Sequence, residues 1–190
     1  MSSPESGRHI GPYTVLHSRP VYENAWIKVR EDRVTGGDEK EATFGVVTMK
    51  PGVTVLPMDE AGDVYLVREF KYGIGESTLE AVSGAIKSGE TPEQAGLREL
   101  GEEVGFTASE WVDMGLINPF TTVVNSPNHM FLARELSEIR RRPGSREEVA
   151  VVKLPFAEAL EAVLEGAITH GASCVVILKA DLYLSRSRRR

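Results

Sequence analysis

The sequence contains few of the features that mark secreted, zinc-binding or membrane-spanning proteins. Cys174 is the one cysteine among 190 residues, which excludes an intramolecular disulfide and a cysteine-rich zinc site. The sequence has no apolar run that approaches the roughly 20 residues needed to cross a bilayer. The first residues, MSSPESGRHIGPY, also lack the charged and then apolar pattern of a secretory signal. We therefore expect a cytoplasmic protein with no membrane partner.

An excess of positive charge is absent as well. The 28 acidic and 22 basic residues leave a formal net charge of -6, whereas proteins that hold phosphate backbones cluster Lys and Arg. Two basic runs, 140–142 and 188–190, are short. We interpret the first as a solvated loop and residues 185–190 as a disordered basic tail. Nucleic acid is therefore not expected as a partner.

Apolar periodicity and turn residues predict strands in the first half of the chain. Residues 1–12 are rich in Ser, Gly and Pro and are expected to be flexible, and residues 13–50 are expected to form an N-terminal β extension. Within that extension, residues 21–34 have the alternating pattern of a strand or a bent hairpin. Two further apolar runs flank the turn Asp59-Glu60-Ala61-Gly62-Asp63, which is typical of a hairpin.

Residues 51–184 are expected to form the main domain. A helix is predicted to start at the capping box of Thr91 and Gln94 and to run to about Val104, where Gly105 stops it. A long loop is expected next. Two strands and two helices are predicted after it, at residues 129–133 and 148–154 and at residues 155–166 and 173–184. This order indicates an α+β fold, a mixed sheet sandwiched between helices, with an antiparallel N-terminal sheet as an extension.

Three glutamates lie close together on the predicted central helix: Glu99, Glu102 and Glu103. On the opposite side, Leu97, Leu100 and Val104 form a narrow apolar face that we expect to pack into the core. Like charges three or four residues apart destabilise a helix by roughly 0.2–0.5 kcal/mol per pair, so a neutralising partner is expected. One interpretation is a solvated acidic face. The other is a site for a hard cation such as Mg²⁺, which prefers carboxylate oxygens and keeps water and phosphate in its remaining positions.

The spacing around these glutamates favours the second interpretation. Five residues separate Gly84 from Glu90, and seven separate Glu90 from Arg98. The fixed positions of the whole run are Gly84, Glu90, Arg98-Glu99, Leu100, Glu102-Glu103, Gly105 and Phe106. This pattern resembles the complete signature of the Nudix hydrolases, enzymes that cleave a nucleoside diphosphate linked to another group. The resemblance implies the Nudix form of the α/β/α sandwich.

The resemblance also implies a metal site. Glu99 and Glu103 resemble the principal metal carboxylates, with Glu102 assisting, and the backbone carbonyl of Ser83 resembles a further ligand. The implied cofactor is Mg²⁺, with Mn²⁺ as a possible substitute. Bound ions would polarise the phosphate oxygens and lower the pKa of the attacking water.

Four signature residues have supporting roles in this resemblance. Arg98 would orient a carboxylate, and Glu90 would hold the loop to the helix. Gly84 would begin the loop that bends around the substrate phosphates, and Gly105 would end the helix.

Beyond the signature, residues from about Val21 to Leu184 resemble the ADP-ribose pyrophosphatase group of Nudix enzymes. The segment VYENAWIKVREDRV resembles that group's N-terminal sheet, which implies a homodimer. The segment VREFKYGIGESTLEAVSGAIKSGE resembles its strand and loop before the signature, and it implies substrate-binding roles for Lys71 and Glu80. Lys71 stands where the group commonly has Arg, and Lys cannot supply the planar fork of Arg to a phosphate.

The segments after the signature carry the remaining site predictions. Gly115-Leu116-Ile117-Asn118-Pro119 resembles the loop whose proline packs near the terminal ribose, so Pro119 and Phe120 are predicted substrate residues. The group commonly has Gly in place of Phe120. Residues 145–149 fall where the group carries a mobile acidic loop, so Glu147 or Glu148 is expected to act as the general base.

The leading functional hypothesis is Mg²⁺-dependent hydrolysis of a nucleoside diphosphate sugar, with ADP-ribose cleaved to AMP and ribose 5-phosphate. A second enzymatic hypothesis is hydrolysis of GDP-mannose, a dinucleoside polyphosphate or a modified nucleoside triphosphate. A hypothesis of another class is a nucleotide-sensing Nudix domain without catalysis. Such domains usually have degraded signatures, whereas every carboxylate is present here.

Overall fold

The computed structural model describes residues 7–37, 40–141 and 149–187. Contacts between residues divide the chain into two compact units. The first comprises the residues up to Lys50 together with Asn118–Pro127, and the second comprises Pro51–Ile117 and the residues from Asn128 onward. Within the described residues, no helix is long and apolar enough to cross a membrane.

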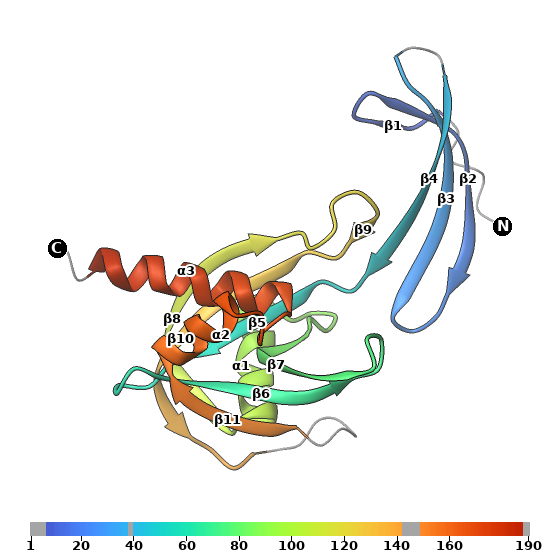
Figure 1. Cartoon of the computed structure of the whole chain (residues 1–190). Helices are drawn as coiled ribbons and strands as arrows, with labels where there is room; N and C mark the ends of the chain where they lie inside the picture. The colour runs from blue at the N-terminus through green and yellow to red at the C-terminus, as the bar shows by residue number, and fades with distance from the viewer. Residues whose placement is uncertain (1–6, 38–39, 142–148, 188–190) are drawn as a thin grey trace. The chain divides into compact units, whose positions relative to one another are not determined.

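The first unit is a five-stranded sheet whose first four strands are blue to teal in Figure 1. In the order of pairing, its strands are β1 (His9–Ile10), β2 (Tyr13–Glu23), β3 (Ile27–Thr35), β4 (Glu41–Met49) and β9 (Val124–Asn125). Neighbouring strands are antiparallel except β4 and β9, which are parallel. The predicted antiparallel N-terminal sheet is therefore confirmed.

A tight turn joins β2 to β3. Asn24 Oδ1 accepts hydrogen bonds from the backbone N–H groups of Trp26 and Ile27, each at 2.8 Å. Of the two interpretations of residues 21–34, the bent hairpin is correct. The sheet also begins earlier than expected, because β1 pairs with β2. The expected flexibility of residues 1–12 stays a prediction, although two of these residues form β1.

The second unit is built on a six-stranded mixed sheet. In the order of pairing, its strands are β11 (Ala150–Pro155), β6 (Asp63–Lys71), β7 (Glu76–Ala85), β5 (Gly52–Pro57), β10 (Asn128–Glu138) and β8 (Phe106–Ile117). Strands β5 and β10 pair in parallel, and the other neighbours are antiparallel. Its helices are α1 (Pro92–Glu103), α2 (Phe156–Leu164) and α3 (Gly171–Ser187).

Helices cover both faces of this sheet (Figure 1). On one face, Val53, Val55 and Val82 pack with Leu100 of α1. On the other face, a second apolar cluster joins the strands to α2 and α3, and it includes Leu56, Leu66, Ala159, Val176 and Ile177. Leu100 is fully buried, and burial of a leucine side chain contributes about 1.5–3 kcal/mol. The α+β sandwich predicted from the sequence is confirmed.

Two boundaries in the second unit differ from the predictions. The segment after Gly105 is the strand β8 rather than a long loop. β8 lies at the edge of the sheet, and its Thr, Ser, Glu and Asp residues weaken the apolar pattern that identifies a strand. Helix α3 extends to Ser187, so the prediction of a disordered tail from 185 is wrong for its first three residues. Leu184, at the predicted end of this helix, packs against the core.

Helix α1 packs closely against the sheet at Gly96, which was not part of its predicted apolar face. A Cβ atom on Gly96 would lie 3.0 Å from the Val55 side chain, so there is little space between helix and strand. With Gly96 against the sheet, Leu97 is 41% exposed, and its assignment to the core face is wrong. Leu100 and Val104 are buried as predicted.

Strand β7 changes neighbours in the middle of its length. It pairs with β6 up to Ala81 and with β5 from Val82 onward. At this change, the Ala81 N–H donates to Ser173 Oγ of α3 at 2.8 Å. The Ser83 N–H donates to Glu103 Oε2 of α1 at 3.3 Å. Side chains of α1 and α3 therefore satisfy two backbone donors of β7 and fix both helices to the same part of the strand.

Candidate active site

The helix that carries the three glutamates begins and ends as predicted. The Gln94 N–H donates to Thr91 Oγ1 at 3.2 Å, and the Thr91 N–H donates to Gln94 Oε1 at 2.9 Å, which completes the capping box. Gly105 has φ of 76°, a left-handed conformation that glycine adopts at little cost. The helix ends at Glu103, whose carboxylate contacts β7.

Arg98 joins the loop before α1 to the glutamates of the helix. Its Nε and Nη2 bind the two oxygens of Glu90 at 2.7 and 3.0 Å. Its Nη1 lies 2.6 Å from Glu99 Oε1 and 3.3 Å from Glu102 Oε2. The hydrogen bonds from Arg98 are the main reason that the pKa of Glu90 is lowered to about 2. The structure thus brings Arg98 into contact with Glu90 and with two of the glutamates, and the supporting roles of Arg98 and Glu90 stay a prediction.

Glu99 lies directly against the first residue of the loop. A Cβ atom at Gly84 would lie 2.0 Å from Glu99 Oε1 and 2.1 Å from its Cδ. No side chain therefore fits at Gly84 while Glu99 keeps its position. The Glu99 side chain is 13% exposed, and burial raises its pKa even though Arg98 lies beside it.

Glu103 is an acid whose charged form is poorly stabilised by the protein. The pKa of Glu103 is raised from 4.5 to about 8, mainly by burial and further by the negative charges of Glu99 and Glu69. The hydrogen bond from the Ser83 N–H and the positive charge of Lys71 offset only part of this effect. A cation placed beside Glu103 would stabilise its carboxylate form.

A second charged cluster lies on one face of the β6–β7 pair. Lys71 Nζ lies 2.5 Å from Glu69 Oε2 and 3.5 Å from Glu80 Oε2. Thr78 Oγ1 donates to Glu80 Oε1 at 2.5 Å, and His170 Nδ1 lies 3.3 Å from Glu80 Oε2. The structure therefore brings together Lys71 and Glu80, the two residues of this region that the sequence predicted.

Sequence reasoning missed three members of this cluster: Glu69, Thr78 and His170. A sequence pattern could have identified the first two, because Glu69 is two residues from Lys71 and side chains at that spacing share a face of a strand. Thr78 has the same spacing from Glu80, and it lies opposite Glu69 in the β6–β7 ladder. His170 had no comparable signal. It lies just before α3, far from β7 in the sequence, and only the packing of α3 brings it to Glu80.

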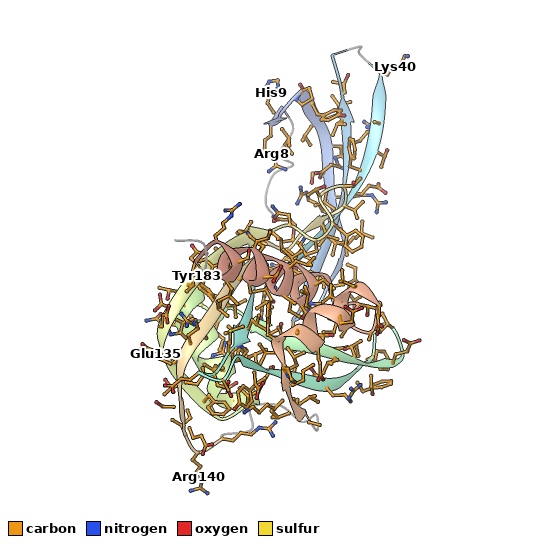
Figure 2. The ribbon with its side chains drawn as sticks, turned by 60° about the vertical axis from the view of Figure 1, so that its left-hand side comes forward. Arg8, His9, Lys40, Glu135, Arg140 and Tyr183 are labelled. Carbon is orange, nitrogen blue, oxygen red and sulfur yellow. The ribbon has the colours of Figure 1, made fainter. Side chains whose placement is uncertain are left out.

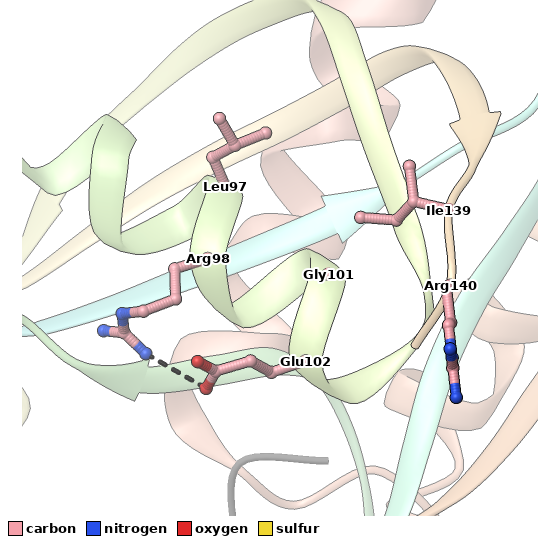
Figure 3. A pocket seen from close by; sticks show the side chains of 6 residues that line it. All are labelled: Leu97, Arg98, Gly101, Glu102, Ile139 and Arg140. Atoms are coloured by element: carbon pink, nitrogen blue, oxygen red, sulfur yellow. Dashed lines mark hydrogen bonds and ion pairs between the residues drawn. The ribbon is translucent and has the colours of Figure 1, made fainter. Parts of the chain in front are cut away.

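A groove of about 410 Å³ lies beside the acidic side of α1. Its lining residues are Leu97, Arg98, Gly101, Glu102, Ile139 and Arg140. Figure 3 shows the apolar Leu97 and Ile139 above the ion pair of Arg98 and Glu102. Arg140, at the end of this lining, projects outward from the second unit (Figure 2). Arg98 and Glu102 therefore border both the groove and the acidic face.

Four further site residues were predicted from the sequence. Pro119 and Phe120 belong to the first unit, whereas the three glutamates belong to the second. Their role in substrate binding stays a prediction. Glu147 and Glu148 lie outside the described residues, so the identity of the general base also stays a prediction.

Comparison with protein families agrees with the two-part organisation and with the signature. The family model of the nucleoside diphosphate sugar hydrolase N-terminal domain matches residues 13–47. The model of the NUDIX domain matches residues 48–172, which include the whole signature. The chain belongs to the Nudix hydrolase family.

Individual relatives carry the comparison further. This Nudix hydrolase is 31% identical over 129 residues to the ADP-ribose pyrophosphatase of Bacillus subtilis (strain 168), and the match covers 64% of this chain and 63% of that relative, less than two thirds of its length. It is 28% identical over 172 residues to the ADP-ribose pyrophosphatase of Mycobacterium tuberculosis (strain ATCC 25618 / H37Rv), covering 87% of this chain and 82% of the relative. A solved structure described as an ADP compounds hydrolase has the same fold, with a TM-score of 0.84, 20% identity, and coverage of 96% of this chain and 100% of that one.

Nudix hydrolases generally use divalent metal ions, and the donors on and beside α1 suit a hard cation. These donors are the carboxylates of Glu99 and Glu103 and the carbonyl of Ser83. Among the described residues, no group of three or more His, Cys, Asp or Glu side chains is arranged to hold a metal ion by itself. Mg²⁺ does not need such a group, because it binds through one or two carboxylates and keeps water and phosphate as its other ligands. The raised pKa of Glu103 fits a cation at this position.

Proposed function

We propose that this Nudix hydrolase uses Mg²⁺ to cleave the diphosphate linkage of a nucleoside diphosphate sugar, with ADP-ribose as the leading substrate. The observation that carries the proposal is the acidic face of α1, where the pKa of Glu103 is raised to about 8, mainly by burial. A bound cation shifts that carboxyl to its charged form at neutral pH. The match of residues 13–47 to the nucleoside diphosphate sugar hydrolase N-terminal domain supports the substrate class, as do the two ADP-ribose pyrophosphatases.

In this proposal, each charged group has a defined task. Glu99 and Glu103, with Glu102 assisting and with the Ser83 carbonyl, would hold the metal. When bound, the metal would polarise the phosphate oxygens and lower the pKa of the attacking water. Lys71 binds a phosphate oxygen as a point charge. A loop glutamate accepts a proton from the water. Attack on phosphorus breaks the diphosphate bridge, so that ADP-ribose gives AMP and ribose 5-phosphate.

A substrate panel tests the proposed reaction. The protein is incubated with MgCl₂ and with ADP-ribose, UDP-glucose, GDP-mannose, a diadenosine polyphosphate or a nucleoside triphosphate, and the products are separated by anion-exchange chromatography. We expect AMP and ribose 5-phosphate from ADP-ribose, with kcat/KM at least about tenfold higher than for the other compounds. EDTA should abolish turnover, and added Mg²⁺ or Mn²⁺ should restore it.

Other outcomes of the panel would change the assignment. Preferred hydrolysis of GDP-mannose, of the dinucleoside compound or of the triphosphate would move the function to that substrate class. Binding of a nucleotide without turnover of any compound would identify a nucleotide-sensing domain, and the catalytic proposal would then be wrong.

We also propose that the first unit mediates a homodimer. Its sheet exposes several large apolar side chains, among them Val21, Tyr22 and Trp26, and exposed apolar surface of this kind is typical of interfaces. Sedimentation velocity at micromolar concentration is expected to give a species of about twice the 20.8 kDa of one chain. The substitution Val21→Glu should shift this species to the monomer. A monomeric wild-type protein would contradict the proposal.

A further inference from the structure

The buried carboxylate of Glu80 lies against side chains from β7, from β6 and from the residue before α3. Its Oε1 accepts a hydrogen bond from Thr78 Oγ1 of β7 at 2.5 Å. Its Oε2 lies 3.5 Å from Lys71 Nζ of β6 and 3.3 Å from His170 Nδ1, which immediately precedes α3. The Glu80 side chain is only 6% exposed, so water contributes little to its stabilisation. The position of this carboxylate therefore depends on its protein partners.

Lys71 connects this carboxylate to the acidic face of α1. Its ammonium lies between Glu69 and Glu80, at 2.5 and 3.5 Å from their oxygens. Burial by itself would lower the pKa of Lys71, but the hydrogen bond to Glu69 and the negative charges of both glutamates raise it on balance, so Lys71 keeps its charge. The charge of Lys71 in turn offsets part of the rise in the pKa of Glu103. The ammonium therefore acts electrostatically on the proposed metal carboxylate.

The imidazole of His170 also contacts a side chain of α3. Its Nδ1 lies 2.8 Å from Ser173 Oγ, and that hydroxyl accepts the Ala81 N–H of β7. The imidazole thus lies between the start of α3 and Glu80, and a shift of the ring would leave Glu80 Oε2 with Lys71 as its remaining neighbour among these residues.

We propose that His170 is a positioning residue: it holds the Glu80 carboxylate, which with Glu69 places the Lys71 ammonium where it binds a substrate phosphate. The part of this inference that concerns phosphate rests on the proposed function. The placement of Lys71 by His170 is independent of it. Without the imidazole, the Glu80 side chain is less restricted, and the Lys71 ammonium can occupy a larger range of positions. Substrate binding is therefore weakened more than the chemical step is slowed.

Two substitutions at His170 separate positioning from support of the helix. The carbonyl of His170 accepts the Cys174 N–H at 3.0 Å, so His170 occupies the N-cap position of α3. Ser and Asn are both favoured at N-caps, and each preserves the start of the helix. The amide nitrogen of Asn is as many bonds from Cα as Nδ1 of His and can donate to Glu80, whereas the Ser hydroxyl is one bond too short. His170→Ser and His170→Asn therefore form a matched pair.

Three measurements are made on the full chain. Isothermal titration calorimetry in EDTA gives the Kd of ADP-ribose without turnover, and initial rates in Mg²⁺ give KM and kcat. The ¹³Cε resonance of Lys71, assigned with Lys71→Arg in lysine-labelled protein, reports the environment of the ammonium without any ligand. Cys174→Ala is the structural control, because it removes the contact of the Cys174 Sγ atom with the Ile168 carbonyl near the start of α3 and leaves the side-chain contacts of His170 in place.

For His170→Ser we expect Kd and KM to rise about tenfold, kcat to change less than about twofold, and the Lys71 resonance to move toward that of free lysine. His170→Asn should restore the wild-type values of Kd, KM and the Lys71 resonance. Cys174→Ala should lower the melting temperature and leave Kd and the resonance unchanged. An unchanged Kd and resonance in His170→Ser would overturn the inference, and so would equal changes in Cys174→Ala or a failure of His170→Asn to restore them. If the wild-type protein neither binds nor hydrolyses ADP-ribose, the proposed function is wrong, and the Lys71 resonance still decides the positioning role.

Discussion

Replacement of Glu103 by Gln is expected to lower kcat by about 1000-fold or more, because a metal ligand contributes several kcal/mol to stabilisation of the transition state. The Gln side chain keeps the size of Glu, and its carbonyl can still accept the Ser83 N–H, but it carries no charge for the cation. Product release from ADP-ribose in MgCl₂ measures the effect. Glu93→Gln, in the exposed first turn of the same helix, is the control and should retain the wild-type rate. A nearly normal rate in Glu103→Gln would exclude Glu103 from the metal site.

The same substitution should stabilise the metal-free protein at alkaline pH. The pKa of Glu103 is about 8 in the folded chain and about 4.5 when unfolded, so between these values the folded state binds more protons. The wild-type protein therefore loses stability as pH rises through this range. In EDTA, we expect its melting temperature to fall relative to that of Glu103→Gln by about 5 °C or more between pH 5 and pH 9. Parallel melting curves of the two proteins across pH would refute the perturbed pKa.

Gly84→Ala is expected to reduce kcat/KM about 100-fold with little loss of stability. The new Cβ would lie 2.0 Å from Glu99 Oε1, so the carboxylate must move, and a displacement of about 1 Å in a catalytic group can cost that factor. The fold should tolerate the change because the obstructing atoms belong to the end of a flexible side chain. Steady-state kinetics and thermal melting measure the two effects.

The control for this prediction is Gly45→Ala in β4. A Cβ atom at Gly45 meets no other atom within 4 Å, so neither rate nor stability should change appreciably. If Gly84→Ala also left the rate unchanged, the close contact with Glu99 would have no bearing on catalysis. If it instead unfolded the protein, the requirement for glycine at this position would come from the strand rather than from the carboxylate.

The layers of the fold and the acidic helix were predictable because their signals are local. The capping box of Thr91 and Gln94 and the left-handed Gly105 fix both ends of α1 within the helix itself. Alternating apolar residues identified most strands. The edge strand β8 was missed because it is partly solvated and polar residues interrupt its pattern. The exposure of Leu97 was missed because the rotation of α1 is set by the close packing of Gly96 on the sheet.

The sequence by itself determined the family and the acidic groups of the site, because the signature lies within one loop and one helix, where spacing alone fixes which side chains are neighbours. Only the tertiary structure decided how burial raises the pKa of Glu103, how Gly84 meets Glu99, and how His170 reaches Glu80. These relations join residues from different elements. They depend on the order of strands in the sheet and on the packing of α1 and α3 against β7, which local sequence patterns do not encode.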